Sequence, residues 1–513
     1  MQTDEDQGAE QAALFEGDAK RRILAIGGGK GGVGKSLIAA NLGIYLAQRG
    51  KRVILVDADL GGANLHTFVG VERPARTLGE FFEKQVENLS DCLVETAVQR
   101  LSLISGEGDA PSPRQATTHR LIAELSELDA DYVIIDLPPG SSPLALDLFL
   151  AAEVGVLVVV PEPTSVENTY RFLKSAFLRG LRHERPKSRP LPRSSEGGLP
   201  SPLDVYAQAK AESAELGDRV KREIQKLRPR LIVNQPRARG DLELGAQIRS
   251  AGRRRLGLHI DYLGHLESDD AVWQAVRKRR PLIVDHPESK VAKNLERIAR
   301  KLMSADHERV VNEEPLLLDE LSLYEVLEIE PGASDEEIRR AVKRARDLYT
   351  PDSLAIWGLF ASDELGAQQR RLDEAYDVLL DAERRHAYDL QRFPDGVFSQ
   401  PVSEPAIRPR ELGRQEAQTR LQLPQPELDA TTEFSGALLK RLRETAGVEL
   451  LEIAERSKIG IAHLRAIEAE NWKALPAPVY LRGFLVEYAR FLRLDIALVV
   501  QTFFARYEQA RIE

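Results

Sequence analysis

The sequence predicts an α/β fold, in which a doubly wound, mostly parallel sheet domain is followed by two small all-α domains. Three observations lead to this prediction. Short β-branched runs alternate with helical patterns up to about residue 304, a glycine-rich loop joins the first run to a helix, and only helical patterns follow residue 315. At roughly 150 residues per domain, the 513 residues also suggest about three domains.

The predicted strands lack the alternation of apolar and polar residues that marks a sheet with one wet face. Their continuous apolar character requires cover on both faces, as in a parallel sheet between two helical layers. The strands are expected at residues 23–26, 53–56, 101–104, 132–135, 156–160, 231–233 and 262–263.

The composition is typical of a folded chain in water, with 42% hydrophobic and 29% charged residues. The formal net charge of −9 gives no whole-chain attraction to nucleic acid or anionic lipid. Cys92 is the only cysteine, which excludes an internal disulfide and predicts a reducing, cytoplasmic location. The first twenty residues lack the apolar core of a secretory signal, and the longest apolar run, residues 154–160, is too short to span a bilayer.

A glycine-rich loop directly follows the first predicted strand. It has the spacing G-x-x-x-x-G-K-S, which ends at Lys35 and Ser36, and a helix begins just after it. Glycines allow successive backbone N–H groups to approach phosphate oxygens at the positive end of a helix dipole. Lys35 adds a cation and Ser36 a hydroxyl for magnesium, so we expect ATP and Mg²⁺ as ligands. The loop residues expected to bind nucleotide are Gly29, Gly31, Gly32, Val33, Gly34, Lys35, Ser36 and Leu37.

A second lysine, Lys30, stands at the start of the loop and directs a charge toward whatever faces it. The sequence KGGVGKS, residues 30–36, resembles the deviant Walker A motif of the MinD/ParA family of ATPases. In that family the first lysine reaches across a nucleotide-sandwich dimer to the phosphates of the partner. The resemblance therefore implies an ATP-dependent homodimer in which Lys30 acts in the neighbouring site.

Further motifs of the family follow in the expected order. Residues 53–65 resemble switch I, residues 132–140 resemble switch II or Walker B, and residues 231–234 resemble the strand end that reads the base. Residues 267–270 resemble a later loop on the adenine side. The whole resemblance covers about residues 21–303.

This resemblance assigns roles to single residues. The catalytic set would be Lys30, Lys35 and Asp59, the last orienting the attacking water. The magnesium set would be Ser36, Asp57 and Asp136, with the two carboxylates acting through waters. Asn234 would read the adenine edge. Any one carboxylate could instead cap a helix, and Asn234 could belong to an ordinary turn, but three strand ends that share one crevice favour ligand binding.

Two segments narrow the resemblance to one branch of the family. Residues 57–65, DADLGGANL, and residues 162–170, EPTSVENTY, look most like the FlhG/FleN and MinD branch, which organises polar or flagellar machinery. MinD proteins end this domain with a basic amphipathic membrane helix, whereas residues 304–315 here are acidic and end in a proline. We therefore expect membrane association to be at most indirect.

Residues 321–390 resemble a J-domain, and Ser334 with the acidic residues after it predicts a helix N-terminus. The His-Pro-Asp signature of J-domains is replaced by Thr350-Pro351-Asp352. Loss of the histidine argues against stimulation of a chaperone ATPase. We expect a J-like docking module, with a simple helical spacer as the alternative.

Residues 434–494 resemble the helix-turn-helix domain of RodZ-type proteins. The candidate recognition helix, residues 461–470, carries two basic groups beside two carboxylates, which are His463, Arg465, Glu468 and Glu470. Because carboxylates repel phosphates, protein docking is favoured over DNA binding. An aromatic stripe at helical spacing is expected to be core, with a partner-binding face as the other option; it consists of Tyr480, Phe484 and Tyr488.

The chain is thus predicted to consist of five parts. They are a tail (1–20), the ATPase domain (21–304, with a surface insertion near 182–202), the J-like domain (318–393), a linker (394–430) and the helix-turn-helix domain (431–513).

Together these features predict a switch ATPase that binds ATP, dimerises, and hydrolyses ATP slowly under stimulation by a partner. Its C-terminal domains would bind proteins, so that the chain acts as a spatial regulator of cell-pole, flagellar or division machinery. We expect it in the cytoplasm, recruited to the inner face of the membrane or to the cell pole. Two other functions stay open: a nucleotide-gated, DNA-binding transcriptional regulator, and an inert scaffold locked on its nucleotide.

Overall fold

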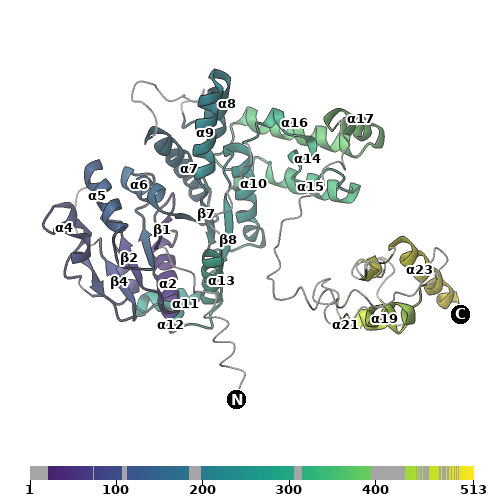
Figure 1. Ribbon diagram of the computed structural model, residues 1–513, viewed down its shortest axis with the longest axis horizontal. Helices are drawn as coiled ribbons and strands as arrows, with labels where there is room; N and C mark the ends of the chain where they lie inside the picture. The colour runs from purple at the N-terminus through teal and green to yellow at the C-terminus, as the bar shows by residue number, and fades with distance from the viewer. Residues whose placement is uncertain are drawn as a thin grey trace, which may run out of the picture. The chain divides into compact units, whose positions relative to one another are not determined.

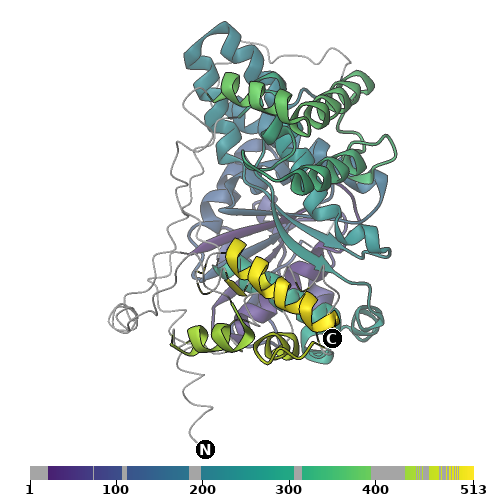
Figure 2. The ribbon, with the colours of Figure 1, turned by 90° about the vertical axis from the view of Figure 1, so that its right-hand side faces the viewer.

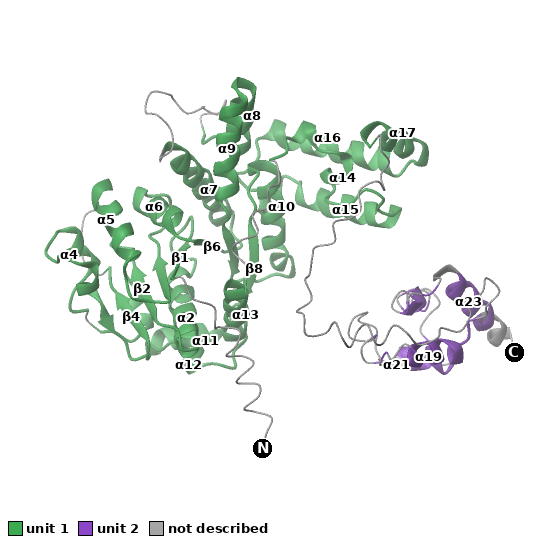
Figure 3. Ribbon diagram, viewed as in Figure 1, with its two compact units in different colours: residues 1–399 green, residues 400–513 purple. Residues whose placement is uncertain are grey.

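The structure is a computed structural model that describes residues 21–304 except 73, 107–112 and 184–197, residues 315–393, and parts of 434–512. Two compact units make up the chain, Met1–Ser399 and Gln400–Glu513 (Figures 1 and 3). The predicted tail, the linker and most of the predicted insertion lie outside the described residues.

A single sheet organises the described part of the first unit. Its eight strands are β1 (Arg22–Gly27), β2 (Val53–Asp57), β3 (Val94–Glu95), β4 (Leu101–Ile104), β5 (Tyr132–Asp136), β6 (Val154–Val159), β7 (Arg230–Asn234) and β8 (Asp261–Leu266). They lie in the order β3-β4-β2-β5-β1-β6-β7-β8, and every pair is parallel except β3 with β4. The predicted doubly wound, mostly parallel sheet is confirmed, whereas the two-residue edge strand β3 was not predicted.

Helices cover both faces of the sheet, as the unbroken apolar strands require (Figures 1 and 2). Along β1, Leu24 and Ile26 belong to one buried cluster and Ala25 to the other, because successive side chains point to opposite faces. The first cluster includes residues of α2 (Lys35–Gln48), α11 (Asp270–Lys278), α12 (Leu282–Asp285) and α13 (Lys290–Ser304). The second includes residues of α5 (Gln115–Leu125), α6 (Pro143–Ala151), α7 (Pro163–His183), α8 (Pro202–Glu212), α9 (Ala214–Lys226) and α10 (Leu244–Leu256).

The J-like module follows the sheet domain within the same compact unit. Its helices are α14 (Leu323–Val326), α15 (Asp335–Leu348), η4 (Leu354–Ile356), α16 (Ser362–Leu379) and α17 (Ala382–Arg392). Ser334 caps α15: its hydroxyl accepts a hydrogen bond from the backbone N–H of Glu337, whose carboxylate accepts one from the N–H of Ser334. The helix start predicted at Ser334 is therefore confirmed.

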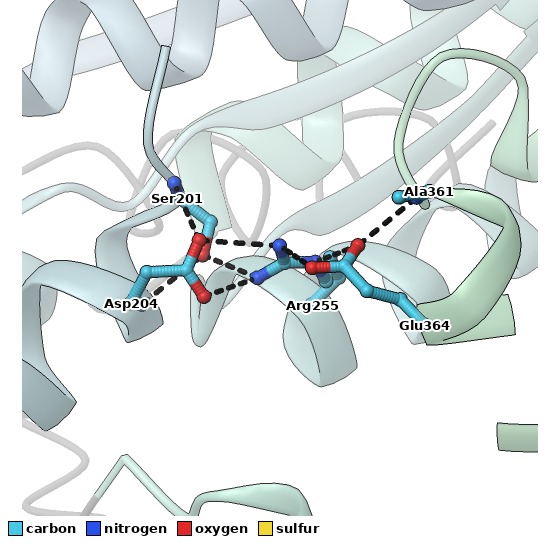
Figure 4. A network of polar contacts seen from close by, with 5 residues as sticks. All are labelled: Ser201, Asp204, Arg255, Ala361 and Glu364. Carbon is cyan, nitrogen blue, oxygen red and sulfur yellow. Dashed lines mark hydrogen bonds and ion pairs between the residues drawn. The ribbon is translucent and has the colours of Figure 1, made fainter. Parts of the chain in front are cut away.

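The J-like module packs against the ATPase domain. Its buried residues share one hydrophobic cluster with the α5–α10 side of the sheet. Arg255 on α10 joins the two parts: it donates hydrogen bonds to Asp204 on α8 and to Glu364 on α16, with 15% of its side chain exposed (Figure 4). A bidentate pair to each carboxylate, in a mostly buried place, fixes the orientation of both partners.

The second unit has a small apolar core built from α19 (Gly436–Thr445), α21 (Ile461–Glu468) and α23 (Ile496–Ile512), among other segments. Tyr488 is fully buried in this core, and its hydroxyl donates to Glu468, which also pairs with Arg443 at 2.6 Å. Tyr488 is therefore a core residue, as expected, and Phe484 is half-buried against the same core. Tyr480 lies outside the residues with described side chains.

Candidate nucleotide site

Four parallel strands bring the predicted site residues to one edge of the sheet. The glycine loop follows β1, Asp57 and Asp136 are the last residues of β2 and β5, and Asn234 is the last residue of β7. Asp57 and Asp136 are directly paired in the register of β2 and β5. Open α/β sheets bind ligands in the crevice at this carboxyl edge, so the predicted residues do converge where a ligand would lie.

Two positions of the loop require glycine, one because of its backbone conformation and both because neighbouring atoms leave no room for a Cβ. Gly34 is the N-cap of α2 with φ of 94°, which L side chains rarely adopt, and a Cβ there would lie 2.4 Å from the amide nitrogen of Asn234. A Cβ on Gly29 would lie 2.3 Å from the carbonyl carbon of Asn168 on α7. The loop is therefore held between β7 and α7, at the N-terminus of α2.

Lys35, Ser36 and Asp136 lie together beneath this loop. Lys35 is buried despite its charge. Burial first, and the charge of Asp57 second, raise the pKa of Asp136 to about 7, while a hydrogen bond from Ser36 and the charge of Lys35 oppose that rise. Among the described residues, no group donates a hydrogen bond to the buried Oδ1 of Asp136. A hydroxyl beside a buried carboxylate oxygen that lacks a partner fits a hard cation such as Mg²⁺.

Asp57 differs from Asp136 in how its oxygens are used. Its carboxylate accepts hydrogen bonds from the backbone N–H groups of Asp59, Asn64 and Leu65, at 3.0 to 3.2 Å. Burial raises its pKa to about 6, although these three bonds work against the rise. Asp57 thus shapes the loop after β2, a role that the sequence did not suggest.

Asp59 lies in that loop, half-buried at the edge of the site. Burial raises its pKa, which the positive charge of Lys35 and a hydrogen bond from the N–H of Gly61 partly offset. The loop turns tightly there, with the N–H of Gly62 donating to the Asp59 carbonyl at 3.1 Å. The predicted catalytic carboxylate is consequently close enough to the buried Lys35 to respond to its charge.

Lys30 lies on the outer side of the loop, with 41% of its side chain exposed. Its ammonium forms a 2.6 Å ion pair with Glu162, which lies between β6 and α7, and this pairing lowers the pKa of Glu162. Sequence reasoning assigned no role to Glu162. Its position just after β6, a buried strand parallel to β1, could have indicated that Glu162 lies near the glycine loop.

Asn234 faces the glycine loop. Its side chain is buried, and its amide nitrogen donates to the Val33 carbonyl at 2.8 Å. Asn234 thus braces the loop through its amide nitrogen. In the predicted adenine-side loop, the carboxylate of Asp269 caps α11 by accepting from the N–H of Ala271.

In the second unit, both carboxylates of the predicted recognition segment form ion pairs within the unit. The carboxylate of Glu468 pairs with the buried Arg443, and that of Glu470 pairs with Arg506 at 2.9 Å. The ring of His463 packs on Phe484, with centroids 5.5 Å apart. Arg465 is exposed on the same helix. The two carboxylates are thus neutralised inside the unit, so the repulsion that we expected from them is weaker than the sequence suggested.

A parallel strand, a loop whose amides open on the N-terminus of a helix, and a buried lysine and carboxylate below that loop define a P-loop NTPase. Residues 19–176 match the ParA family, described as NUBPL iron-transfer P-loop NTPase. The predicted resemblance of this domain to the ParA/MinD family is therefore confirmed. Residues 322–389 match the DnaJ domain and residues 438–499 a helix-turn-helix domain, so both predicted C-terminal resemblances are confirmed.

Three known proteins illustrate what this domain is similar to. The antiactivator FleN of Pseudomonas aeruginosa is 28% identical over 288 residues, which are 55% of this chain and 86% of that protein. The septum site-determining protein MinD of Helicobacter pylori is 27% identical over 56% of this chain and 92% of its own length. A protein of Oltmannsiellopsis viridis described as "Putative septum site-determining protein MinD" is 33% identical over 31% of this chain and 50% of its own length.

A solved structure, the septum site-determining protein MinD from Pyrococcus horikoshii in complex with Mg-ADP, is 21% identical. It superposes with a TM-score of 0.38 over 55% of this chain and 96% of that protein. Among the described helices, none is both long and apolar enough to cross a bilayer.

Proposed function

We propose that this protein is a switch ATPase that binds Mg–ATP at the carboxyl edge of its sheet, dimerises through that edge and hydrolyses ATP slowly. The observation that carries the proposal is the site below the loop. There a buried lysine lies with the Ser36 hydroxyl and with a carboxylate oxygen of Asp136 that has no hydrogen-bond partner among the described residues. A nucleoside triphosphate requires a cation and a magnesium site, which Lys35 and the pair Ser36 and Asp136 would provide.

Each residue then has a role. The backbone N–H groups of residues 29–37 and the ammonium of Lys35 would bind the phosphates, and Ser36 with Asp136 would hold the magnesium ion. The bound ion supplies neutralisation of phosphate charge. Asp59 would orient the attacking water, and the amide oxygen of Asn234 would meet the adenine edge. Asp57 would act mainly through the loop that it shapes.

Lys30 would complete the site of a second copy. In this chain its ammonium pairs with Glu162 at the surface, so it must leave that partner to reach phosphates across a dimer. Such a site would have Lys35 but lack its second positive charge until two copies meet, and hydrolysis would therefore be coupled to dimerisation. A slow ATPase of this kind acts as a timer, not as a metabolic enzyme.

The cellular role would be spatial regulation of cell-pole, flagellar or division machinery. The similarity to an antiactivator FleN and to septum site-determining MinD proteins supports this role. The J-like and helix-turn-helix domains would bind the protein partners, including one that stimulates hydrolysis. We place the protein in the cytoplasm, with recruitment to the membrane or pole through those partners.

The test is nucleotide binding and turnover by the full chain. Lys35→Ala should weaken Mg–ATP binding by about 100-fold, since it removes a buried cation that faces phosphate. Asp59→Ala should bind Mg–ATP as the wild type does but lose at least about 100-fold in turnover. Unchanged binding by the Lys35 variant would refute the site, and unchanged turnover by the Asp59 variant would refute its catalytic role.

DNA binding by the second unit is the alternative function, and the internal pairing of Glu468 and Glu470 is the observation that keeps it open. Salt-dependent, sequence-selective retention of the full chain on DNA would support it. If Arg465→Ala did not weaken such retention, the helix of residues 461–468 would not be the DNA-contacting element.

A further inference from the structure

The J-like module contacts the same helix that borders the glycine loop. The hydroxyl of Tyr170, which is buried on α7, donates to the Ala355 carbonyl in η4 at 2.5 Å. Two residues earlier on α7, the backbone of Asn168 packs against Gly29 so closely that a Cβ there would clash. One short stretch of α7 therefore touches both the phosphate loop and the J-like module.

The contact continues to the surface. The loop after η4 passes beside Glu167, since a Cβ on Gly358 would lie 2.4 Å from the Cγ of that side chain. Trp357, the neighbour of Gly358, is 44% exposed. The exposed tryptophan is thus linked to Lys30 by successive contacts, through Glu167 and Asn168 to Gly29.

We propose that Trp357 belongs to the homodimer interface, where it contacts a second copy of this chain. The inference rests on the proposed dimer and extends it, because it makes the J-like module part of the surface that two copies share. If Lys30 reaches the phosphates of a partner, that partner must cover the outer side of the glycine loop. The surface that continues from there, over the exposed side of α7 to Trp357, lies at the rim of the same contact.

Two features suit Trp357 for this position. Tryptophan contributes a large apolar area to an interface and is enriched among residues that dominate binding energy. Its loop is already fixed by the bond between Tyr170 and Ala355 and by the Arg255 bridge to Glu364, so little conformational entropy is lost when a partner binds. The charged side chain of Glu167 lies beside the same loop, as a polar rim lies around an apolar contact.

Fluorescence of the full chain tests the proposal directly. The chain has three tryptophans. A variant with Trp273→Phe and Trp472→Phe keeps Trp357 as the only reporter. With Mg²⁺ and a nonhydrolysable ATP analogue, its emission should shift to shorter wavelength and its quenching by iodide should fall by about half, relative to ADP, because dimerisation removes the ring from water.

A second variant measures how much Trp357 contributes to the affinity of the dimer. Trp357→Ala should raise the dissociation constant of the analogue-bound dimer by about 10-fold or more, with unchanged nucleotide affinity and melting temperature. Trp273→Ala is the matched control, since Trp273 is 62% exposed on α11, and it should leave dimerisation unchanged.

The outcomes separate the two claims. A dimer that forms with ATP analogue while Trp357 emission and the effect of Trp357→Ala both stay at control level overturns the inference and leaves the proposed function standing. Absence of any dimer from the wild type overturns both.

Discussion

Asp136 is a buried carboxylate whose pKa lies near neutral. Burial and the charge of Asp57 hold that pKa at about 7, against about 3.9 for an unperturbed aspartate. At pH values between these two pKa values, Asp136 keeps its proton in the folded protein but has lost it in the unfolded chain. The contribution of Asp136 to stability is therefore complete below about pH 4 and is lost as the pH rises toward 7. Magnesium, which needs the ionised form, competes with this proton.

We therefore predict that, without nucleotide and Mg²⁺, the free energy of unfolding of the first unit falls between pH 5 and pH 8. Each unit of pKa shift corresponds to about 1.4 kcal/mol, so the loss should exceed about 1 kcal/mol. Asp136→Asn cannot ionise and should flatten this slope, as urea unfolding at both pH values would measure. Asp129→Asn, at an exposed position, serves as control. Equal slopes for wild type and Asp136→Asn would contradict the assignment.

Asn234 stabilises the glycine loop from β7, which can be tested by removing its side chain. Asn234→Ala removes the donor to the buried Val33 carbonyl and should lower the free energy of unfolding by about 1–3 kcal/mol. If the amide oxygen also reads adenine, calorimetry should find that the variant loses its preference for ATP over GTP. A parallel loss of affinity for both nucleotides would mean that Asn234 only supports the loop.

Helix α7 is the element that joins the parts of the first unit. Its first turns contact the glycine loop at Gly29, and Tyr170 reaches the J-like module. The Arg255 bridge from α8 through α10 to α16 adds a second connection (Figure 4). Burial alone would raise the pKa of Asp204, yet hydrogen bonds and charge from Arg255 hold it below its usual value. The J-like module is thereby a fixed part of the ATPase unit.

The prediction for this element compares two arginines. Arg255→Ala leaves Asp204 and Glu364 without their shared cation and should lower the free energy of unfolding by about 2–4 kcal/mol, with loss of hydrogen-exchange protection in α14 to α17. Arg171→Ala removes an exposed pair with Glu167 on α7 and should cost less than about 1 kcal/mol. Similar losses for both variants would mean that the Arg255 bridge does not hold the module.

The sequence predicts most strands and the glycine loop, but not the contacts that join segments far apart in the chain. The inner strands follow from unbroken apolar runs, while β3 is two residues long and pairs antiparallel at the edge, which leaves no pattern to detect. The glycine loop and the carboxylates at strand ends follow from spacing. The pairs Lys30–Glu162 and Arg255–Glu364 join residues more than 100 positions apart, so they depend on the folded arrangement.

The proposed function requires the whole molecule to change state. Lys30 pairs with Glu162 in a single chain and would contact the neighbouring nucleotide in a dimer. This makes Lys30 dispensable for binding nucleotide but necessary for pairing two copies. In the proposed dimer, pairing would also depend on the third phosphate, because that group is the one that a lysine from across the interface would meet.

Sedimentation velocity with Mg²⁺ and either ADP or a nonhydrolysable ATP analogue measures this most directly. The wild type and the exposed-lysine control Lys293→Ala should be monomers with ADP and dimers with the analogue. Lys30→Ala should bind the analogue and stay monomeric. A wild type that stays monomeric with the analogue, or a Lys30→Ala protein that dimerises as readily as the control, would contradict the account.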